Sequence, residues 1–127
     1  MKILNIVLIL TLLTGCKSKT EIQIFGHWKM YKVIQDRKDV TSDHNPNDDR
    51  FLILQSDRTF ESGGTPIGKN TGKYVYNSID KTLFLDSDAG SDDDSQWKVQ
   101  IRNDTMYWQG YGSEWAKRFE LIHLREQ

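Results

Sequence analysis

Five carboxylates are concentrated between Asp86 and Asp94, around a glycine at position 90. Hard cations such as Ca²⁺ take six to eight oxygen ligands at about 2.3–2.6 Å, and acidic loops with a glycine at a sharp turn can supply them. The run does not complete a known calcium loop, because no Asp or Glu occupies the twelfth position counted from Asp86. Solvated loop charge is therefore the preferred interpretation, a calcium loop is the alternative, and no metal site is predicted. A second acidic patch, to which the same interpretation applies, contains Asp39, Asp43, Asp48 and Asp49.

Residues 63–70, GGTPIGKN, have the glycine spacing and the following lysine of a phosphate-binding loop. However, Asn70 stands where a Ser or Thr hydroxyl would have to reach Mg²⁺. The flanking residues have strand patterns, so no helix N-terminus is expected to face a phosphate. We interpret this segment as a loop without a nucleotide.

The residues that could act as zinc ligands or as nucleophiles do not form a recognisable catalytic pattern. His27, His44 and His123 show no His-x-His or His-x₃-His pairing, so no zinc site is predicted. No nucleophile elbow is present, and the nearest serines lie in expected turns. We expect neither a cofactor nor an enzymatic activity. A small hydrolase or isomerase that uses acids in a barrel mouth is the weaker alternative.

The only cysteine, Cys16, ends an apolar N-terminal run, and acylation is its expected chemistry. Lys2 precedes the apolar residues 3–13, and the small residues Thr14 and Gly15 fit a cleavage pocket. The pattern resembles the signal peptide of bacterial lipoproteins, which implies cleavage before Cys16 and membrane attachment through lipid chains on its thiol. An ordinary secretory signal or a short transmembrane helix are the alternatives, although the run is too short to span about 30 Å of hydrocarbon.

These features predict a signal peptide over residues 1–15, a tether over 16–21 and a folded domain over 22–127. The expected location is the bacterial cell envelope, with the lipid anchor in the outer membrane. Removal of the signal peptide leaves 112 residues, enough for one small domain. The remaining 16 basic and 18 acidic side chains provide no basic excess for nucleic-acid binding. No cysteine remains for a disulfide.

Apolar residues after position 25 recur mostly with a period of two, which is typical of half-buried strands. The predicted strands are residues 28–35, 50–55, 59–62, 72–77, 82–86, 96–102, 105–109 and 117–124. Short turn signals such as 56–58, 77–81 and 103–104 favour antiparallel neighbours. The sequence therefore predicts an all-β fold of about eight strands, either a barrel or two stacked sheets. Only a brief helical turn near residues 21–26 is expected.

Several short motifs occur in the order that the lipocalin superfamily shows, and the chain resembles the small bacterial lipocalin-like lipoproteins. They are FGHW at 25–28, SDRTFE at 56–61, GKY at 72–74 and KRFEL at 117–121, although Asp57-Arg58 departs from the usual Asp-Gly. The resemblance implies an antiparallel up-and-down barrel. It further implies that Gly26 provides a tight turn, that Trp28 plugs the closed end, and that Arg125, or failing that Arg118, covers the indole.

The resemblance also implies binding or carriage of a small, largely apolar molecule inside the barrel. Strand alternation predicts which side chains line that interior. They are Phe51, Ile53, Tyr74, Tyr76, Trp97, Val99, Ile101, Met106 and Trp108. Because 112 residues is short for the family, the alternative is an interaction module whose barrel is filled by its own side chains. The aromatic and glycine-rich residues 108–115 fit either a mouth or a packed barrel end.

Overall fold

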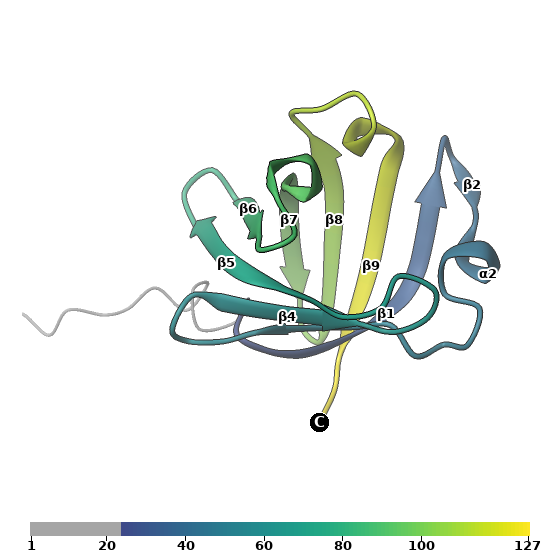
Figure 1. Ribbon diagram of the computed structural model, residues 1–127, viewed down its shortest axis with the longest axis horizontal. Coiled ribbons are helices and arrows are strands. Elements are labelled where there is room, and N and C mark those ends of the chain that lie inside the picture. Colours follow the sequence, from purple (N-terminus) through teal and green to yellow (C-terminus); the bar gives the residue numbers. More distant parts are fainter. Residues whose placement is uncertain (1–23) are drawn as a thin grey trace, which may run out of the picture.

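Strands that follow one another along the chain pair edge to edge until the sheet closes on itself (Figure 1). The computed structural model describes residues 24–127, so Cys16 and the predicted signal peptide and tether lie outside the described residues. The strands are β1 (Gly26–Gln35), β2 (Lys38–Asp39), β3 (Phe51–Leu54), β4 (Thr59–Gly63), β5 (Asn70–Asn77), β6 (Thr82–Ser87), β7 (Ser95–Arg102), β8 (Thr105–Tyr111) and β9 (Phe119–Arg125).

All strand pairs are antiparallel, and pairing of β1 with β9 closes the barrel. The two-residue strand β2 pairs only with the end of β1 and adds to the eight barrel strands. The prediction of a small all-β, up-and-down barrel is therefore confirmed, and two stacked sheets are excluded.

Within residues 24–127, Ile24 is helical, and three further short segments are helical. They are α2 (Thr41–His44) and two 3₁₀ turns, η1 (Ser91–Asp93) and η2 (Ala116–Arg118). The helix α2 was not predicted, because its four residues are too few to show a helical period. No helix within the described range has the length and apolar character that a membrane crossing requires.

The two ends of the barrel differ in the length of their connections. Tight turns at residues 55–58, 78–81 and 103–104 join strands at the closed end. The longer connections 36–50, 64–69, 88–94 and 112–118 all lie at the opposite, open end. Short turns hold neighbouring strands close together at one end of the barrel. Long connections at the other end can surround an entrance to the interior.

Trp28 closes the barrel at the end with the tight turns. Its side chain is fully buried, and its Nε1 donates a hydrogen bond to the carbonyl oxygen of Ile24 at 3.0 Å. The guanidinium of Arg125 lies over the indole, with Cζ 4.2 Å from the ring centroid, and Nη1 donates to the carbonyl of Phe25. Gly26 has a φ of +132°, and a Cβ there would come within 2.8 Å of Arg125 Nη1. Glycine at this position therefore permits both the turn and the close approach of the guanidinium.

Of the two basic residues considered for this cover, Arg118 lies elsewhere. It forms an exposed ion pair with Asp36 at 2.6 Å, which joins the connection after β1 to the start of β9. The two guanidinium groups thus hold opposite ends of the barrel.

Inward-facing side chains form the core, and one strand differs from the prediction. Leu52 and Leu54 of β3 are buried and face inward, whereas Ile53 between them faces the outer side. The interior assignment of Ile53 was wrong because all four residues of β3 are apolar, and alternation cannot select a face. In β1 the register shifts between Met30 and Lys32, which keeps the inward pattern in phase with β9.

Candidate functional site

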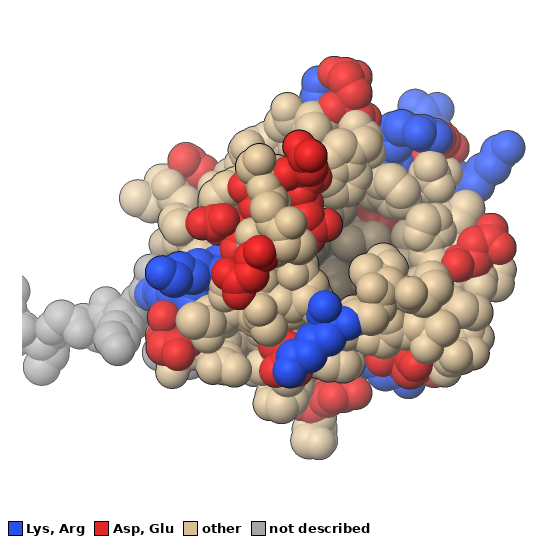
Figure 2. Space-filling model, in the orientation of Figure 1, with Lys and Arg blue, Asp and Glu red and all other residues tan. Residues whose placement is uncertain are grey.

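A cavity of about 580 Å³ opens at the end of the barrel with the long connections. Figure 2 shows a hollow in this face of the molecule, with acidic side chains gathered at one side. The apolar part of its wall comes from several strands and includes Met30, Leu52, Phe60, Leu85, Trp97 and Leu121. The volume falls within the range typical of small-molecule sites, about 300–1,000 Å³.

Two buried polar atoms that border this cavity lack a hydrogen-bond partner. They are Nε1 of Trp108 and Nδ1 of His123. The two residues are 4% and 2% exposed, and their ring centroids lie 4.6 Å apart. A buried donor or acceptor without a partner costs about 1–3 kcal/mol. The protein therefore maintains these two unpaired polar atoms beside a mostly apolar cavity at a cost to its stability.

The imidazole of His123 is held in its neutral form. Burial, and to a smaller extent the positive charge of Arg50, lowers the pKa of His123 to about 3. Loss of hydration penalises the charged imidazolium, and the guanidinium repels it. At neutral pH the ring therefore carries one N–H donor and one acceptor nitrogen.

Arg50 brings a positive charge to the same cavity. Its Nη1 donates to the carbonyl of His44 at 3.0 Å, and its side chain is half-buried. None of the ion pairs formed within residues 24–127 includes Arg50. Burial lowers the pKa of the guanidinium, which nevertheless remains charged at any physiological pH.

The connection between β1 and β3 determines where Arg50 lies. Asn45, itself buried, accepts a hydrogen bond from the backbone N–H of Arg50 at 3.1 Å and donates through Nδ2 to the carbonyl of Met30 at 3.1 Å. The backbone N–H of Met30 in turn donates to the carbonyl of Arg50 at 3.0 Å. The side-chain amide of Asn45 thus takes the place of backbone hydrogen bonds between strands, and it holds Arg50 beside β1.

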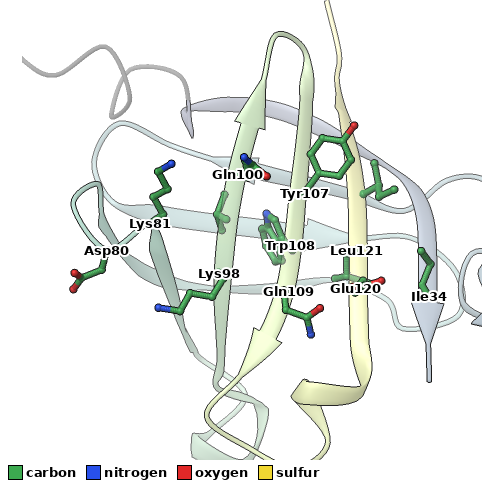
Figure 3. A pocket seen from close by; sticks show the side chains of 12 residues that line it. Ile34, Asp80, Lys81, Lys98, Gln100, Tyr107, Trp108, Gln109, Glu120 and Leu121 are labelled. Carbon is green, nitrogen blue, oxygen red and sulfur yellow. The ribbon is translucent and has the colours of Figure 1, made fainter. Parts of the chain in front are cut away.

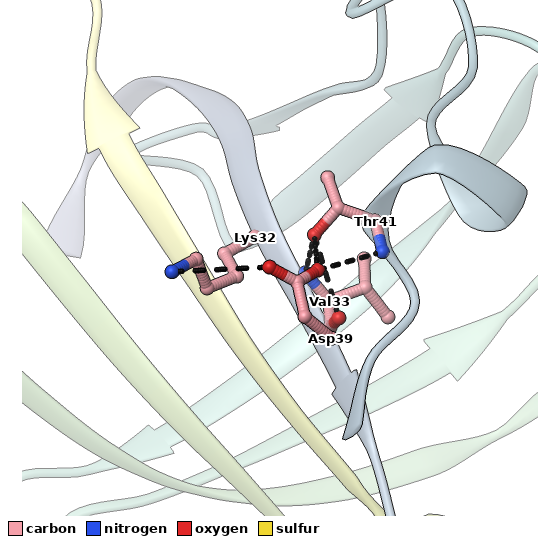
Figure 4. Close-up of polar contacts among 4 residues, drawn as sticks. All are labelled: Lys32, Val33, Asp39 and Thr41. Atoms are coloured by element: carbon pink, nitrogen blue, oxygen red, sulfur yellow. Dashed lines mark hydrogen bonds and ion pairs between the residues drawn. The ribbon is translucent and has the colours of Figure 1, made fainter. Parts of the chain in front are cut away.

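The helix α2 is secured to β1 by the polar contacts in Figure 4. The hydroxyl of Thr41 accepts a hydrogen bond from the backbone N–H of Val33 at 3.0 Å and donates to the carboxylate of Asp39. The bond from the hydroxyl, with a second from the backbone N–H of Thr41, holds the pKa of the Asp39 carboxyl below its usual range. Lys32 lies 3.9 Å from the same carboxylate. These contacts position the carbonyl of His44 that Arg50 binds.

Aromatic side chains continue from Trp108 to the rim. Trp97 lies 5.2 Å from Trp108 and 6.4 Å from Trp115, and Trp115 lies 6.3 Å from Phe119, all between ring centroids. Trp115 is 45% exposed, and Ile67, on the connection between β4 and β5, is 64% exposed. Both border the cavity. The entrance is thus partly apolar on two different connections.

The 3₁₀ turn η2 can lie so close to β8 because residue 110 is glycine. A Cβ at Gly110 would clash with the carbonyl oxygen of Ala116, which is fully buried. Gly110 therefore has a packing role, while Trp108 and Trp115 border the cavity.

The acidic run at 86–94 is organised by its own hydrogen bonds. Asp93 accepts bonds from Nδ2 of Asn70 and Oγ of Ser87, both at 2.7 Å. Asp94 accepts a bond from the backbone N–H of Ser87 at 2.8 Å. Residues 24–127 contain no group of three or more His, Cys, Asp or Glu residues arranged to hold a metal ion. The carboxylates of Asp93 and Asp94 thus shape the connection between β6 and β7.

Residues 63–70, which have the glycine spacing of a phosphate-binding loop, connect strands β4 and β5 at the open end. The element that follows this segment is the strand β5 and not a helix. Lys69 pairs with Glu61 at 3.3 Å. This geometry lacks the helix N-terminus that a phosphate-binding loop needs.

A second depression, of about 440 Å³, lies on the outer face of the barrel (Figure 3). Lys98, Gln109 and Tyr107 border it and alternate with inward residues of β7 and β8. Trp108, whose Nε1 lacks a partner, borders both this depression and the interior cavity. The interior cavity is the better candidate because its polar groups converge and its apolar walls enclose a ligand.

The residues predicted to line the interior have three different positions. Trp97 and Trp108 border the cavity with inward side chains, and Phe51 borders it at the edge of β3. Tyr74, Val99 and Met106 are buried in the packed core, while Tyr76 and Ile101 pack against that core from its edge. Ile53 faces outward.

Sequence reasoning missed Arg50 and His123 as site residues. His123 did carry a signal, since it follows Phe119 and Leu121 at two-residue spacing and interrupts an apolar face. Arg50 carried none, because it precedes its strand and reaches the cavity through loop contacts.

Comparison with known proteins adds information on the fold. No protein-family model matches the sequence, and no curated protein matches it either. Among solved structures, the chain is similar to the crystal structure of a DUF4847 family protein from Bacteroides vulgatus ATCC 8482, with a TM-score of 0.58 and 13% sequence identity. The match covers 82% of this chain and 96% of that chain. At this identity the likeness shows a shared barrel fold alone.

Proposed function

We propose that this chain is a lipid-anchored, lipocalin-like protein of the bacterial envelope that binds or carries a small, largely apolar molecule in its barrel. The single observation that carries the proposal is the cavity of about 580 Å³ with its mostly apolar wall. A barrel filled by its own side chains would have no such space. The lipid anchor is proposed from Cys16 and its preceding residues.

Binding without catalysis fits the composition of the cavity better than an enzymatic reaction. Among the described residues that border the cavity, Asp93 is the single carboxylate, and it already accepts hydrogen bonds from Asn70 and Ser87. Paired buried carboxylates are a common source of perturbed acids and bases in catalytic sites. Trp97, Trp108 and Trp115 instead provide flat apolar surfaces for a ligand.

Titration of the full chain with Nile red, a neutral dye that fluoresces in apolar surroundings, tests this proposal. We expect saturable binding at micromolar concentration, with quenching of tryptophan emission because Trp97 and Trp108 border the cavity. Leu85→Trp should fill part of the cavity and weaken binding at least tenfold. Val75→Trp adds the same side chain on the outer face, where Val75 is 64% exposed, and should leave binding unchanged.

Absence of saturable binding to Nile red and to other apolar probes would overturn the proposal in favour of an interaction module. If Leu85→Trp and Val75→Trp weaken Nile red binding equally, the dye binds outside the cavity. That result would also overturn the proposal in favour of an interaction module.

A further inference from the structure

We propose that the cavity selects apolar molecules that carry a carboxylate or another oxyanion, and that Arg50, Trp108 and His123 bind this head group. The inference rests on the proposed ligand-binding function and specifies the chemistry of the ligand. It is carried by two buried atoms without partners, Nε1 of Trp108 and Nδ1 of His123, and by the positive charge of Arg50 at the same cavity.

The available hydrogen-bonding groups of these three residues are mostly donors. Indole Nε1 of Trp108 can only donate, and the guanidinium of Arg50 can only donate. The neutral imidazole of His123 can supply one further N–H. A ligand that satisfies two donor-only groups must present acceptor oxygens, and a charged acceptor forms bonds about twice as strong as a neutral one.

The strand register brings these three residues together. Met30 of β1 pairs with His123 of β9, and the backbone of Met30 is bonded to that of Arg50 on the other side. His123 also pairs with Met106 of β8, two residues before Trp108. The positive charge of Arg50 is felt at His123, which is one cause of the low pKa of that imidazole. Arg50, His123 and Trp108 therefore form one continuous patch across adjacent strands.

The surroundings leave the charge of Arg50 available to an anion. Within residues 24–127, Arg50 has no carboxylate at ion-pair distance, whereas Lys69 at the mouth is already paired with Glu61. An anion in the enclosed patch would be attracted more strongly than one at the exposed mouth, because the local dielectric is lower. The apolar body of the ligand would lie against Trp97 and the apolar wall.

Isothermal titration of the full chain with dodecanoate and with dodecan-1-ol compares a charged and a neutral head group on the same apolar body. We expect dodecanoate to bind about 10- to 100-fold more tightly, the range for loss of one charged hydrogen bond. Arg50→Gln should weaken dodecanoate by that factor and leave dodecan-1-ol within twofold of wild type. Arg50→Lys, which retains a cation, should recover part of the difference.

Two further variants distinguish binding of the head group at this patch from non-specific electrostatic attraction of an anion to the protein. Trp108→Phe keeps an aromatic ring and removes the N–H, so it should weaken dodecanoate more than dodecan-1-ol. Lys69→Gln removes a cation at the mouth, where its side chain is 69% exposed, and should leave both affinities unchanged. In ¹H–¹⁵N spectra the indole resonance that Trp108→Phe removes should shift with dodecanoate and much less with dodecan-1-ol.

The outcomes distinguish the two proposals. Equal affinity for the acid and the alcohol, or equal loss of both in Arg50→Gln, would overturn the head-group inference and leave the ligand-binding proposal standing. Failure of both compounds to bind, together with failure of Nile red, would overturn both proposals. The wild-type comparison needs no variant, so it remains decisive if Arg50→Gln fails to fold.

Discussion

Lowering the pH from 7 to 5 should destabilise this protein through one residue, His123. An unfolded histidine titrates near 6.5, whereas the pKa of His123 in the barrel is about 3. Between these values the unfolded chain binds a proton that the folded chain does not. The stability contributed by His123 is therefore fully present above pH 6.5 and is lost as the pH falls toward 3.

The linkage relation gives the size of this effect. At pH 5 proton uptake by the unfolded histidine stabilises the unfolded state by about 2 kcal/mol, whereas at pH 7 the effect is only about 0.2 kcal/mol. The expected loss is a large part of the stability of a small domain, which is about 5–15 kcal/mol. The part of the loss that falls between pH 7 and pH 5 occurs above the pH range in which ordinary carboxylates titrate.

Urea unfolding followed by tryptophan fluorescence at pH 7, 6 and 5 measures the loss. The variant His123→Met removes the titrating group and should show a free energy of unfolding that is about 2 kcal/mol less sensitive to this pH change. His27→Gln, which removes an exposed imidazole, is the matched control and should keep the wild-type loss. The reasoning is refuted if wild type and His123→Met lose the same stability between pH 7 and pH 5.

Four other variants test the anchor and the packing. Cys16→Ser should abolish incorporation of a labelled fatty acid and release the protein from membranes, and retained label in the variant would disprove the anchor. Trp28→Ala should lower the free energy of unfolding by about 3–5 kcal/mol, the usual cost of emptying a large core site, whereas Arg125→Ala should cost about 1 kcal/mol; a urea midpoint unchanged in Trp28→Ala would contradict the plug. Gly110→Ala should cost about 1–3 kcal/mol, because its Cβ clashes with the carbonyl of Ala116; thermal unfolding at the wild-type temperature would show that η2 can move away freely.

Strand alternation was enough to predict most of the barrel, because most strands have one apolar and one polar face. On β7, for example, Trp97 and Val99 are buried while Lys98 is exposed. The method failed at β3, where all of Phe51–Leu54 is apolar and only pairing with β1 and β4 determines which side is inside.

The candidate site was less predictable than the fold because it combines residues whose proximity depends on barrel closure. His123 belongs to the last strand, and Arg50 belongs to the end of the connection that follows the first. Neither residue belongs to a sequence motif. The two residues come close to each other only when β9 pairs with β1. The size of the cavity likewise depends on strand stagger, which periodicity does not encode.

The hydrogen bond between Ile24 and Trp28 places the start of the described chain at the base of the barrel, the end with the tight turns. Because the described chain begins at the end with the tight turns, an anchor on Cys16 would attach the protein by its base. With such an anchor the base of the barrel would lie nearer to the bilayer, on average, than the entrance would, because Ile24 is the first described residue after the proposed tether. A fluorophore on Ile79→Cys, near the base, should be quenched by lipid-borne quenchers more than one on Ile67→Cys at the entrance. The reverse order would show that the barrel lies with its mouth toward the bilayer.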